Sequence, residues 1–309
     1  MKKLRFLVSL ITKDNDYQIE QANVATETAR RLGHDIEIIF AGNDPINQSQ
    51  QLLTIIQSPG NHPDAVLIEP VGGTGLPHVA KAAVSAGMGW VVLNRDVDYI
   101  PELRRVAHAP VFGVSTDHLE IGRIQGRHVA ALTPIGGTVV YIHGPSTSSA
   151  VRQRTIGMQE AKPEATKIIV LRGQWTEESS RRAVSAWMLL STSQKTPIDM
   201  IAAQNDDMAM GARKAIQDHT NVAVREKWLS LPFTGVDGLP NTGQDYVRRG
   251  LLAATVITPA ITALALEALV GGFQKGSQPA ELIMSVPVSF PSIADLGSRH
   301  TEKPRPHAT

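Results

Sequence analysis

Apolar residues along this chain follow two alternating patterns. Short, nearly continuous apolar runs rich in Val, Ile and Leu are typical of strands buried on both faces. The stretches between them carry apolar residues three or four positions apart, which is typical of amphipathic helices. Local signals agree with this division, since Gly33 stands where the first helical stretch ends and Pro45 where the second begins. The chain is therefore predicted to alternate strands with helices.

The predicted elements extend over most of the chain. Strands are expected over residues 4–11, 34–40, 65–68, 90–93, 111–115, 138–142, 167–171, 200–203, 233–236, 253–257 and 284–290. Helices are expected over residues 19–32, 45–57, 76–86, 119–132, 150–161, 177–190, 206–217 and 259–270. Alternation of this kind predicts an α/β fold, in which parallel sheets carry helices on both faces.

The series of strands and helices restarts near Val111. Two series of about five βα units each favour two doubly wound domains. A length of 309 residues also favours two domains over one. A single eight-fold barrel is the alternative, and the number of strands and the restart both disfavour it.

Composition narrows the classes of protein that remain. Hydrophobic residues make up 42% of the chain and charged residues 19%, which excludes a wholly disordered chain. The net charge of +1 disfavours a strongly basic nucleic-acid-binding module. Because the chain has no cysteine, a disulfide framework, a thiolate zinc site, an iron–sulfur cluster and a cysteine nucleophile are all excluded.

The two ends of the chain carry further signals. Residues 1–3 resemble the start of a signal peptide, but Arg5 and Ser9 interrupt the apolar run that follows, and no small-residue cleavage site comes after it. No stretch approaches the ~20 apolar residues of a membrane span, so no insertion into a membrane is expected. A cytosolic protein and an exported protein whose leader was removed both remain open. The polar tail from Ser298 is expected to be loose.

Polar side chains follow many of the predicted strands, and ligands of parallel α/β sheets bind at the carboxyl ends of strands. The candidate ligand-binding residues are Asn15, Tyr17, Glu69, Asn94, Arg95, Arg154, Trp175, Asn205, Asp237 and Thr258. Carboxylates, amides and guanidinium groups match vicinal hydroxyls, which both donate and accept hydrogen bonds. Aromatic faces such as those of Tyr17 and Trp175 can cover the C–H face of a sugar ring. This set favours recognition of a small polyol over bond cleavage.

Several candidates also have a purely structural interpretation. Arg95 could pair with Asp96 or Glu102 at the surface, while Tyr17 and Trp175 could be ordinary half-buried aromatic residues. Helix capping is the structural alternative for Asn205, Asp206 and Asp237.

Motifs for catalysis are missing from the sequence. The segment GTG (residues 73–75) follows a strand, but His78 replaces the third glycine of a dinucleotide fingerprint. The segment GPS (residues 144–146) is not a nucleophile elbow, and the carboxylates of residues 206–207 would point in two directions on a helix. The ten histidines show no HExxH motif. The chain is therefore expected not to be an enzyme and to hold no cofactor or metal.

Seven segments at the predicted strand ends together resemble one protein family. They are SLITKDNDYQ (residues 9–18), LIEP (67–70), LNRD (93–96), SAVRQRTIGM (149–158), AAQNDDMAMGA (202–212), TGVDGLP (234–240) and LLAATVITP (251–259). In this order they are similar to the type I periplasmic sugar-binding proteins, above all to the ribose- and galactose-binding group. The same fold serves as the effector domain of lactose-repressor-family regulators. The resemblance covers residues 4–290, nearly the whole chain.

The resemblance implies two Rossmann-like lobes joined by a three-stranded hinge, with a sugar in the cleft. The hinge crossings are expected near residues 115–116, 258–259 and 287–288. The amino-terminal lobe would comprise residues 1–115 and 259–287, and the carboxy-terminal lobe residues 116–258 and 288–309. Ligand contacts to both lobes would drive a closing hinge motion.

The resemblance also implies roles for the candidate residues. In the first lobe, Asn15 and Tyr17 match polar and aromatic positions after the first strand, and Asn94 and Arg95 match an Asp-Arg pair. In the second lobe, Arg154 matches a ligand-binding arginine, with Arg152 as a candidate partner, and Trp175 falls near an aromatic position. Asn205 and Asp237 match an amide and a carboxylate of the same lobe.

This sequence departs from the ribose binders at several of these positions. Gln18 replaces a second aromatic residue, Glu69 stands where the ribose binders have an amide, and Thr258 stands where they have a glutamine. A site built to pair particular hydroxyls rejects other ligands strongly. We therefore expect a pentose, a hexose or a cyclitol, with ribose itself disfavoured.

Three hypotheses about function follow from the sequence. The first is a monomeric, periplasmic solute-binding protein whose partners are a small sugar or polyol and the permease of an ABC importer. The second is a cytoplasmic sugar-sensing domain that acts through a transcription or signalling partner, although no helix-turn-helix headpiece fits before the first strand. The third is an enzyme on an α/β fold, which no nucleophile–base or metal constellation supports.

Overall fold

The computed structural model describes residues 2–60, 62–73 and 75–301. Within these residues the chain forms two compact units. The first unit contains the described residues up to Thr116, together with Thr147–Ala150 and Pro259–Ser285. The second unit contains Asp117–Ser146, Val151–Thr258 and the described residues from Val286 onward.

The first unit is built on a six-stranded sheet with the strand order β11-β5-β4-β3-β1-β2. Its strands are β1 (Arg5–Leu10), β2 (Asp35–Phe40), β3 (Ala65–Ile68), β4 (Gly89–Leu93), β5 (Val111–Thr116) and β11 (Leu282–Ser285). Every pair of neighbouring strands is parallel, and the register places Val8 of β1 opposite Ile38 of β2 and Leu67 of β3. The strands β3, β4 and β5 are buried throughout, which explains their unbroken apolar runs.

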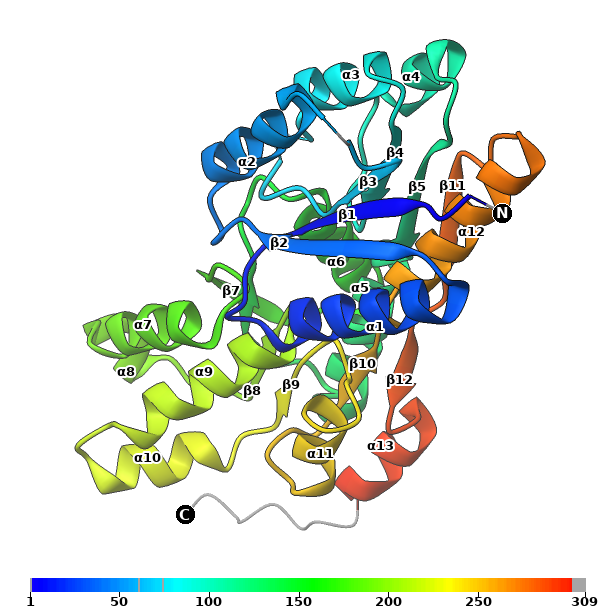
Figure 1. Ribbon diagram of the computed structural model, residues 1–309. Coiled ribbons are helices and arrows are strands. Elements are labelled where there is room, and N and C mark those ends of the chain that lie inside the picture. Colours follow the sequence, from blue (N-terminus) through cyan, green and yellow to red (C-terminus); the bar gives the residue numbers. More distant parts are fainter. Residues whose placement is uncertain (1, 61, 74, 302–309) are drawn as a thin grey trace. The chain divides into compact units, whose positions relative to one another are not determined.

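Helices cover both faces of this sheet (Figure 1). They are α1 (Asp16–Leu32), α2 (Pro45–Gln57), α3 (Pro77–Ser85), α4 (Ile100–Val106) and α12 (Thr262–Lys275). Ala25 of α1 and Leu266 of α12 belong to the core on one face, and Leu52 of α2 and Val79 of α3 to the core on the other. Each helix thus buries one apolar stripe, which is the source of its helical periodicity in the sequence.

The second unit has a four-stranded parallel sheet with the strand order β7-β6-β8-β9. Its strands are β6 (Thr138–His143), β7 (Lys167–Arg172), β8 (Met200–Ala203) and β9 (Phe233–Thr234). Single parallel bridges join Thr234 to Ala254 and Asp237 to Ile257, so that β10 (Thr255–Ile257) runs beside β9. β10 pairs in the antiparallel direction with β12 (Val288–Phe290).

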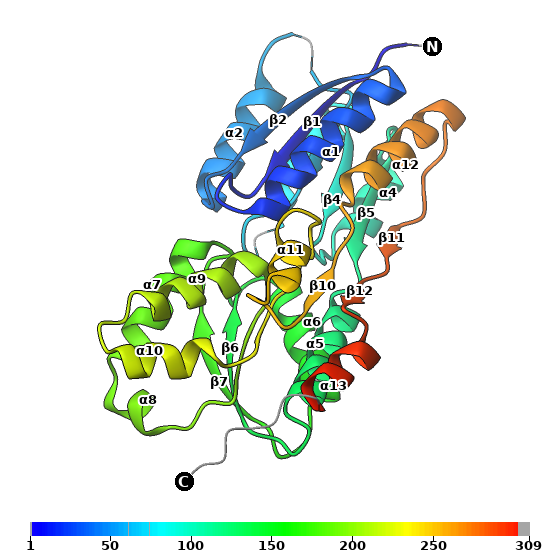
Figure 2. The same ribbon diagram turned by 90° about the horizontal axis from the view of Figure 1, so that it is seen from below.

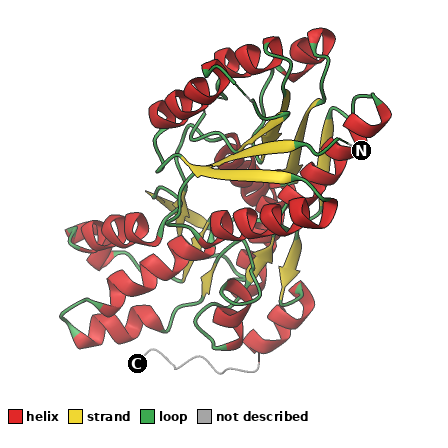
Figure 3. Cartoon of the chain, in the orientation of Figure 1, coloured by secondary structure: helices red, strands yellow, loops and turns green. Residues whose placement is uncertain are grey.

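Helices also cover both faces of the second sheet, as Figures 2 and 3 show. They are α5 (His118–Leu132), α6 (Ser149–Ala161, in this unit from Val151), α7 (Glu177–Met188), α8 (Ser191–Lys195), α9 (Asp206–Gln217), α10 (Val222–Leu229), α11 (Gly243–Arg248) and α13 (Ile293–Thr301). Helices α7, α9 and α10 contribute to the core on one face, and α5, α6 and α13 to the core on the other. The predicted α/β fold is confirmed, and the strands form separate open sheets rather than one barrel.

Two predictions at the end of the chain are wrong. The single strand expected over residues 284–290 is divided between two units, because β11 pairs with β5 and β12 pairs with β10. Pro287 lies between them and has no N–H to donate to either sheet. The tail expected to be loose from Ser298 is helical up to the end of α13, since Leu296 is buried in the core of the second unit. Residues 302–309 lie outside the described residues.

Four short helices were not predicted from the sequence, namely α4, α8, α10 and α11. Each is at most eight residues long. A helix of that length shows too few turns for its apolar period to stand out from a loop.

A buried histidine makes the stability of the second unit depend on pH. The Nε2 atom of His128 on α5 lies 2.8 Å from Ser289 Oγ. Burial, and secondarily the charge of Arg127, lowers the pKa of His128 from 6.5 to about 3. Below pH ~6.5 the unfolded chain binds a proton at this residue and the folded chain does not. The free energy of unfolding is therefore expected to fall by about 1.4 kcal/mol per pH unit as the pH drops from ~6.5 toward ~3.

Urea unfolding of the wild type and of His128→Gln at pH ~7.5 and ~5.0 tests this expectation. Glutamine keeps a partner for Ser289 but does not titrate. The loss of unfolding free energy between the two pH values is expected to be about 2 kcal/mol smaller in the variant. The same loss in both proteins would contradict this role of His128.

Candidate functional site

The order of strands reverses beside one strand in each sheet. In the first unit β1 lies between β2 and β3, and in the second unit β6 lies between β7 and β8. Ligands of doubly wound sheets bind outside the carboxyl ends of the strands at such reversals. Two groups of residues occupy these ends. The first-unit cluster consists of Asn15, Tyr17, Gln18, Glu69, Asn94 and Arg95, and the second-unit cluster of His118, Arg154, Trp175, Gln204, Asn205, Asp237 and Thr258.

Glu69 is the centre of the first-unit cluster. It follows β3, it is buried, and its Oε2 atom accepts hydrogen bonds from Gln18 Nε2 at 3.0 Å and from Asn94 Nδ2 at 3.5 Å. Its Oε1 atom forms an ion pair with Arg95 at 3.2 Å. Gln18 is itself fixed, because its Oε1 atom accepts a hydrogen bond from the Ile11 backbone at 2.9 Å. The buried carboxylate is thus surrounded by protein donors, as a buried charge requires.

Arg95 is the cation of the first-unit cluster. Its side chain is only 6% exposed, and one terminal nitrogen contacts both Glu69 and the backbone oxygen of Asn94, the latter at 2.8 Å. Its Nε atom is buried and has no hydrogen-bond partner among the described residues. Arg95 therefore pairs with Glu69 and not with Asp96 or Glu102, and it keeps an unused buried donor.

Tyr17 and Asn94 connect to each other at the base of this cluster. The Tyr17 hydroxyl accepts a hydrogen bond from Asn94 Nδ2 at 3.2 Å and donates one to the backbone oxygen of Pro259 at 3.3 Å. Asn94 has a φ angle of 55°, a left-handed conformation that asparagine tolerates better than most residues. Asn15 is the N-cap of α1, where its side chain accepts from the Gln18 backbone at 3.0 Å.

Arg154 is the cation of the second-unit cluster. It is buried on α6, donates to the backbone oxygen of Gln204 at the end of β8, and contacts His118 Nδ1 at 3.4 Å. Its guanidinium carbon lies 5.5 Å from the centre of the Trp175 ring, which is a cation–π contact. Arg152 is exposed whereas Arg154 is buried, and the role of Arg152 as a partner of Arg154 stays a prediction.

Trp175 is held from two sides. Asn205 donates to the Trp175 backbone oxygen at 2.9 Å, while its own Oδ1 atom accepts from Met208 as the N-cap of α9. A Cβ atom at Gly144 would lie 2.4 Å from the Trp175 indole, so only glycine leaves room for the ring. The helix-cap interpretation of Asn205 is therefore correct, and the same side chain also positions the aromatic residue.

Asp237 and Thr258 complete the second-unit cluster. Both are buried, and the Thr258 backbone donates to the Asp237 backbone oxygen at 3.0 Å. Asn205, Asn221 and Thr242 occupy the N-cap positions of α9, α10 and α11, so the cap interpretation of Asp237 is wrong. Its φ angle of 110° is rare for a residue with a side chain and marks a backbone held by its surroundings.

The groups beneath the second-unit cluster are neutral at pH 7. Gln204 accepts from the Gly144 backbone at 3.1 Å and donates to the Tyr141 hydroxyl at 3.2 Å. Burial raises the pKa of Tyr141 above its ordinary value, so the hydroxyl remains protonated and donates to Gln125 at 2.8 Å. Burial also lowers the pKa of His143 from 6.5 to about 4. Arg154 supplies the guanidinium group of this cluster and Asp237 its carboxyl group.

Gln18, His118 and Gln204 are not among the ligand-binding residues predicted from the sequence. Gln204 follows β8 directly, and the strand-end rule does point to it. Gln18 and His118 lie within the first turn of a helix and give no signal in the apolar pattern. Their roles depend on partners distant in the sequence, Glu69 and Arg154.

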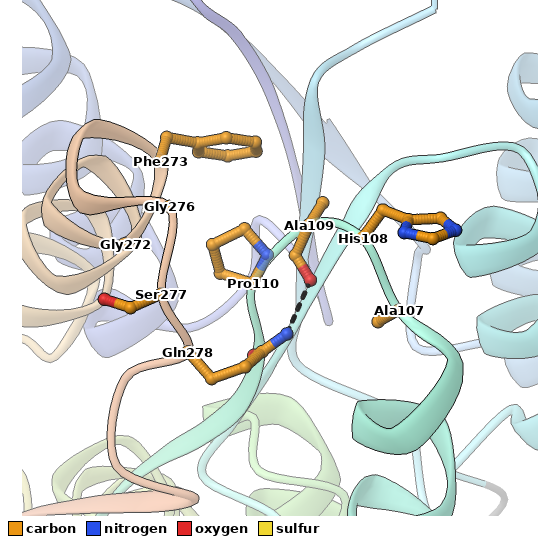
Figure 4. A pocket seen from close by; sticks show the side chains of 9 residues that line it. All are labelled: Ala107, His108, Ala109, Pro110, Gly272, Phe273, Gly276, Ser277 and Gln278. Carbon is orange, nitrogen blue, oxygen red and sulfur yellow. Dashed lines mark hydrogen bonds between the residues drawn. The ribbon is translucent and has the colours of Figure 1, made fainter.

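A separate hollow of about 200 Å³ lies in the first unit, where Pro110 precedes β5 (Figure 4). It is at the amino-terminal end of the strand, opposite to the end at which ligands of parallel sheets bind. Gln278 lines this hollow, and its side chain donates a hydrogen bond to the Ala109 backbone oxygen at 3.0 Å and accepts one from the Val111 backbone N–H at 2.8 Å. These contacts explain the hollow as the junction of two loops.

The described residues contain neither a helix suited to a membrane nor a cluster suited to a metal ion. None of the helices in residues 2–60, 62–73 and 75–301 combines the length and the apolar character needed to cross a membrane. In the same part of the chain, no three His, Asp or Glu side chains gather as a metal ion would require.

Comparison with known families identifies the class of protein that this fold and these clusters define. A model of the family described as periplasmic binding protein domain matches residues 6–269. The match covers most of the chain, and the chain belongs to this family. It is a family of binding proteins and not of enzymes, which confirms the class predicted from the seven segments.

Individual relatives are more distant. The chain is 25% identical over 256 residues to the ribose import binding protein of Salmonella typhimurium, covering 83% of this chain and 79% of the relative. It is 23% identical over 301 residues to the galactofuranose-binding protein of Escherichia coli, covering 96% of this chain and 89% of the relative. The solved structure of the Caulobacter myo-inositol binding protein bound to myo-inositol has a TM-score of 0.78 at 22% identity, covering 97% of each chain.

Proposed function

We propose that this chain binds one small, uncharged sugar or cyclic polyol and delivers it to the permease of an ABC importer. The ligand would contact Asn15, Tyr17, Asn94 and Arg95 of the first-unit cluster and Arg154, Trp175, Asn205, Asp237 and Thr258 of the second-unit cluster. The relatives support a ligand of this class, since they include proteins named for binding ribose, galactofuranose and xylitol.

The observation that carries the proposal is the unused donor of Arg95. A buried N–H without an acceptor costs about 1–3 kcal/mol, and a ligand hydroxyl in hydrogen-bond reach would remove that cost. Because a guanidinium donates in a fixed planar fork, it also selects the position of the acceptor. Arg95 is thus suited to recognise one particular hydroxyl or ring oxygen.

The charges of the two clusters support an uncharged ligand. The first-unit cluster pairs the cation of Arg95 with the anion of Glu69. The second-unit cluster contains one guanidinium group, that of Arg154, and one carboxyl group, that of Asp237. A charged ligand would leave a net charge in a buried environment, which is costly, whereas hydroxyl groups both accept from guanidinium groups and donate to carboxylates.

The proposal extends to the location and the oligomeric state. We propose that the protein acts as a monomer in the periplasm, because a single chain supplies both clusters and the family is one of periplasmic binding proteins.

A thermal-shift screen tests the proposed ligand class. The panel contains D-ribose, D-allose, D-galactose, L-arabinose, xylitol and myo-inositol, with glucose 6-phosphate as a charged control. At ligand near 100 times Kd, linkage gives about 2.7 kcal/mol of stabilisation, which should raise Tm by several degrees. At least one neutral member is expected to raise Tm and the phosphate ester is not. A flat panel, or a response to the ester alone, would contradict the proposal.

A further inference from the structure

Glu69 differs from the other residues of the first-unit cluster in how its polar atoms are used. A carboxylate offers about four lone-pair sites. In Glu69 three of these face protein donors, namely Gln18, Asn94 and Arg95. The side chain is 4% exposed. Its acceptor capacity is therefore directed at the protein rather than outward.

The two residues at which this chain departs from the ribose binders after β1 and β3 contact each other. The donor of Gln18 lies 3.0 Å from Glu69, and its acceptor is held by the Ile11 backbone. The amide therefore has one orientation, with its N–H₂ toward the carboxylate. An aromatic residue at position 18 could not hold Glu69 in this way, and an amide at position 69 would not neutralise Arg95.

Arg95 depends on this arrangement. Its contacts to Glu69 and to the Asn94 backbone oxygen use the same terminal nitrogen. This fixes the plane of the guanidinium group and leaves the Nε–H as the unused donor. The backbone next to Arg95 is fixed as well, because the neighbouring Asn94 side chain donates hydrogen bonds to both Tyr17 and Glu69.

We propose that Glu69 is a positioning residue that determines ligand specificity through Arg95. Gln18 holds the Glu69 carboxylate, and the carboxylate in turn fixes the direction of the Arg95 Nε–H. This inference rests on the proposed function only for its effect on the ligand. The fixing of Arg95 is a property of the protein without ligand, so the two parts can be tested separately.

The ligand-free part is tested by the NMR signal of the Arg95 Nε–H, assigned by its disappearance in Arg95→Lys. The wild type is expected to give a dispersed, slowly exchanging signal. Glu69→Gln is expected to shift it toward the position of a free arginine and to speed its exchange with water about tenfold or more. Glu267→Gln makes the same chemical change in an exposed ion pair with Arg31 and serves as the control. An unchanged Arg95 signal in Glu69→Gln would overturn the positioning role, whether or not a sugar binds.

The ligand part is tested by a double-mutant cycle, with D-ribose, D-allose and myo-inositol as probes in calorimetric titrations. Glu69→Gln is expected to weaken binding about tenfold in the wild-type background and less than about twofold in the Arg95→Lys background. Equal losses in both backgrounds would mean that Glu69 contacts the ligand itself, which overturns the proposal. Should no neutral member of the thermal-shift panel bind while Glu69→Gln still releases the Arg95 signal, the proposed function fails and the positioning role stands.

Discussion

Arg95→Lys is expected to weaken sugar binding by about 10- to 100-fold with little change in the free energy of unfolding. Lysine keeps a positive charge beside Glu69, so the buried carboxylate stays paired. It has no second planar donor to replace the Nε–H. A hydrogen bond to a charged group contributes about 1.5–3 kcal/mol, which corresponds to this loss of affinity.

Arg104→Lys is the matched control for this prediction. Arg104 lies in the same unit and forks to the backbone oxygens of Val111 and Pro279, away from the first-unit cluster. Its replacement by lysine removes the same planar guanidinium donors and is expected to leave the affinity for the sugar unchanged. Calorimetric titration of both variants separates the two effects. An Arg95→Lys variant that binds as tightly as Arg104→Lys would contradict the role given to Arg95.

Asp206→Ala is expected to lower the free energy of unfolding of the second unit by about 2–6 kcal/mol. Asp206 is buried at the start of α9, and its two carboxylate oxygens accept from Thr255 Oγ1 at 2.7 Å and from the Gly238 backbone at 2.8 Å. Alanine would leave both donors without this acceptor, at about 1–3 kcal/mol for each. Gly238 adjoins Asp237, so sugar affinity is expected to fall as well.

The neighbouring residue provides the control. Asp207 lies on the same first turn of α9 and is more exposed than Asp206. Asp207→Ala is expected to lower the free energy of unfolding by less than Asp206→Ala does, because water solvates its more exposed carboxylate. Urea unfolding of both variants measures the two losses. Similar losses for the two substitutions would show that the contacts of Asp206 are not what stabilises this region.

The fold could be predicted because its determinants are local. Each buried strand needs an apolar run, and each helix needs one apolar stripe, so both periods are visible in the sequence. The short helices could not be predicted because they have too few turns to show a period, and the division at Pro287 could not be predicted because it depends on which strands β11 and β12 pair with. Such pairings join residues far apart in the chain and leave no periodic signal.

The positions of the site residues could be predicted from the sequence, but the side chains that each of them contacts could not. The strand-end rule predicts Glu69 and Arg95 separately as site residues, but it does not predict the buried ion pair between them. The sequence shows that Gln18 replaces an aromatic residue of the ribose binders, but it does not show that Gln18 contacts Glu69. Asp206 was considered as a cap, whereas it is the acceptor for Thr255 and Gly238. Hydrogen-bond partners across strands require coordinates.

The proposed function requires that both clusters bind the same sugar molecule. It is tested by a crystal structure of the protein with the panel member that raises Tm most. We expect a sugar oxygen within hydrogen-bond distance of Arg95 Nε, further oxygens bonded to Arg154 and Asp237, and the Trp175 ring against the C–H face of the sugar. A sugar bound elsewhere, with no contact to Arg95, Arg154 or Asp237, would contradict it.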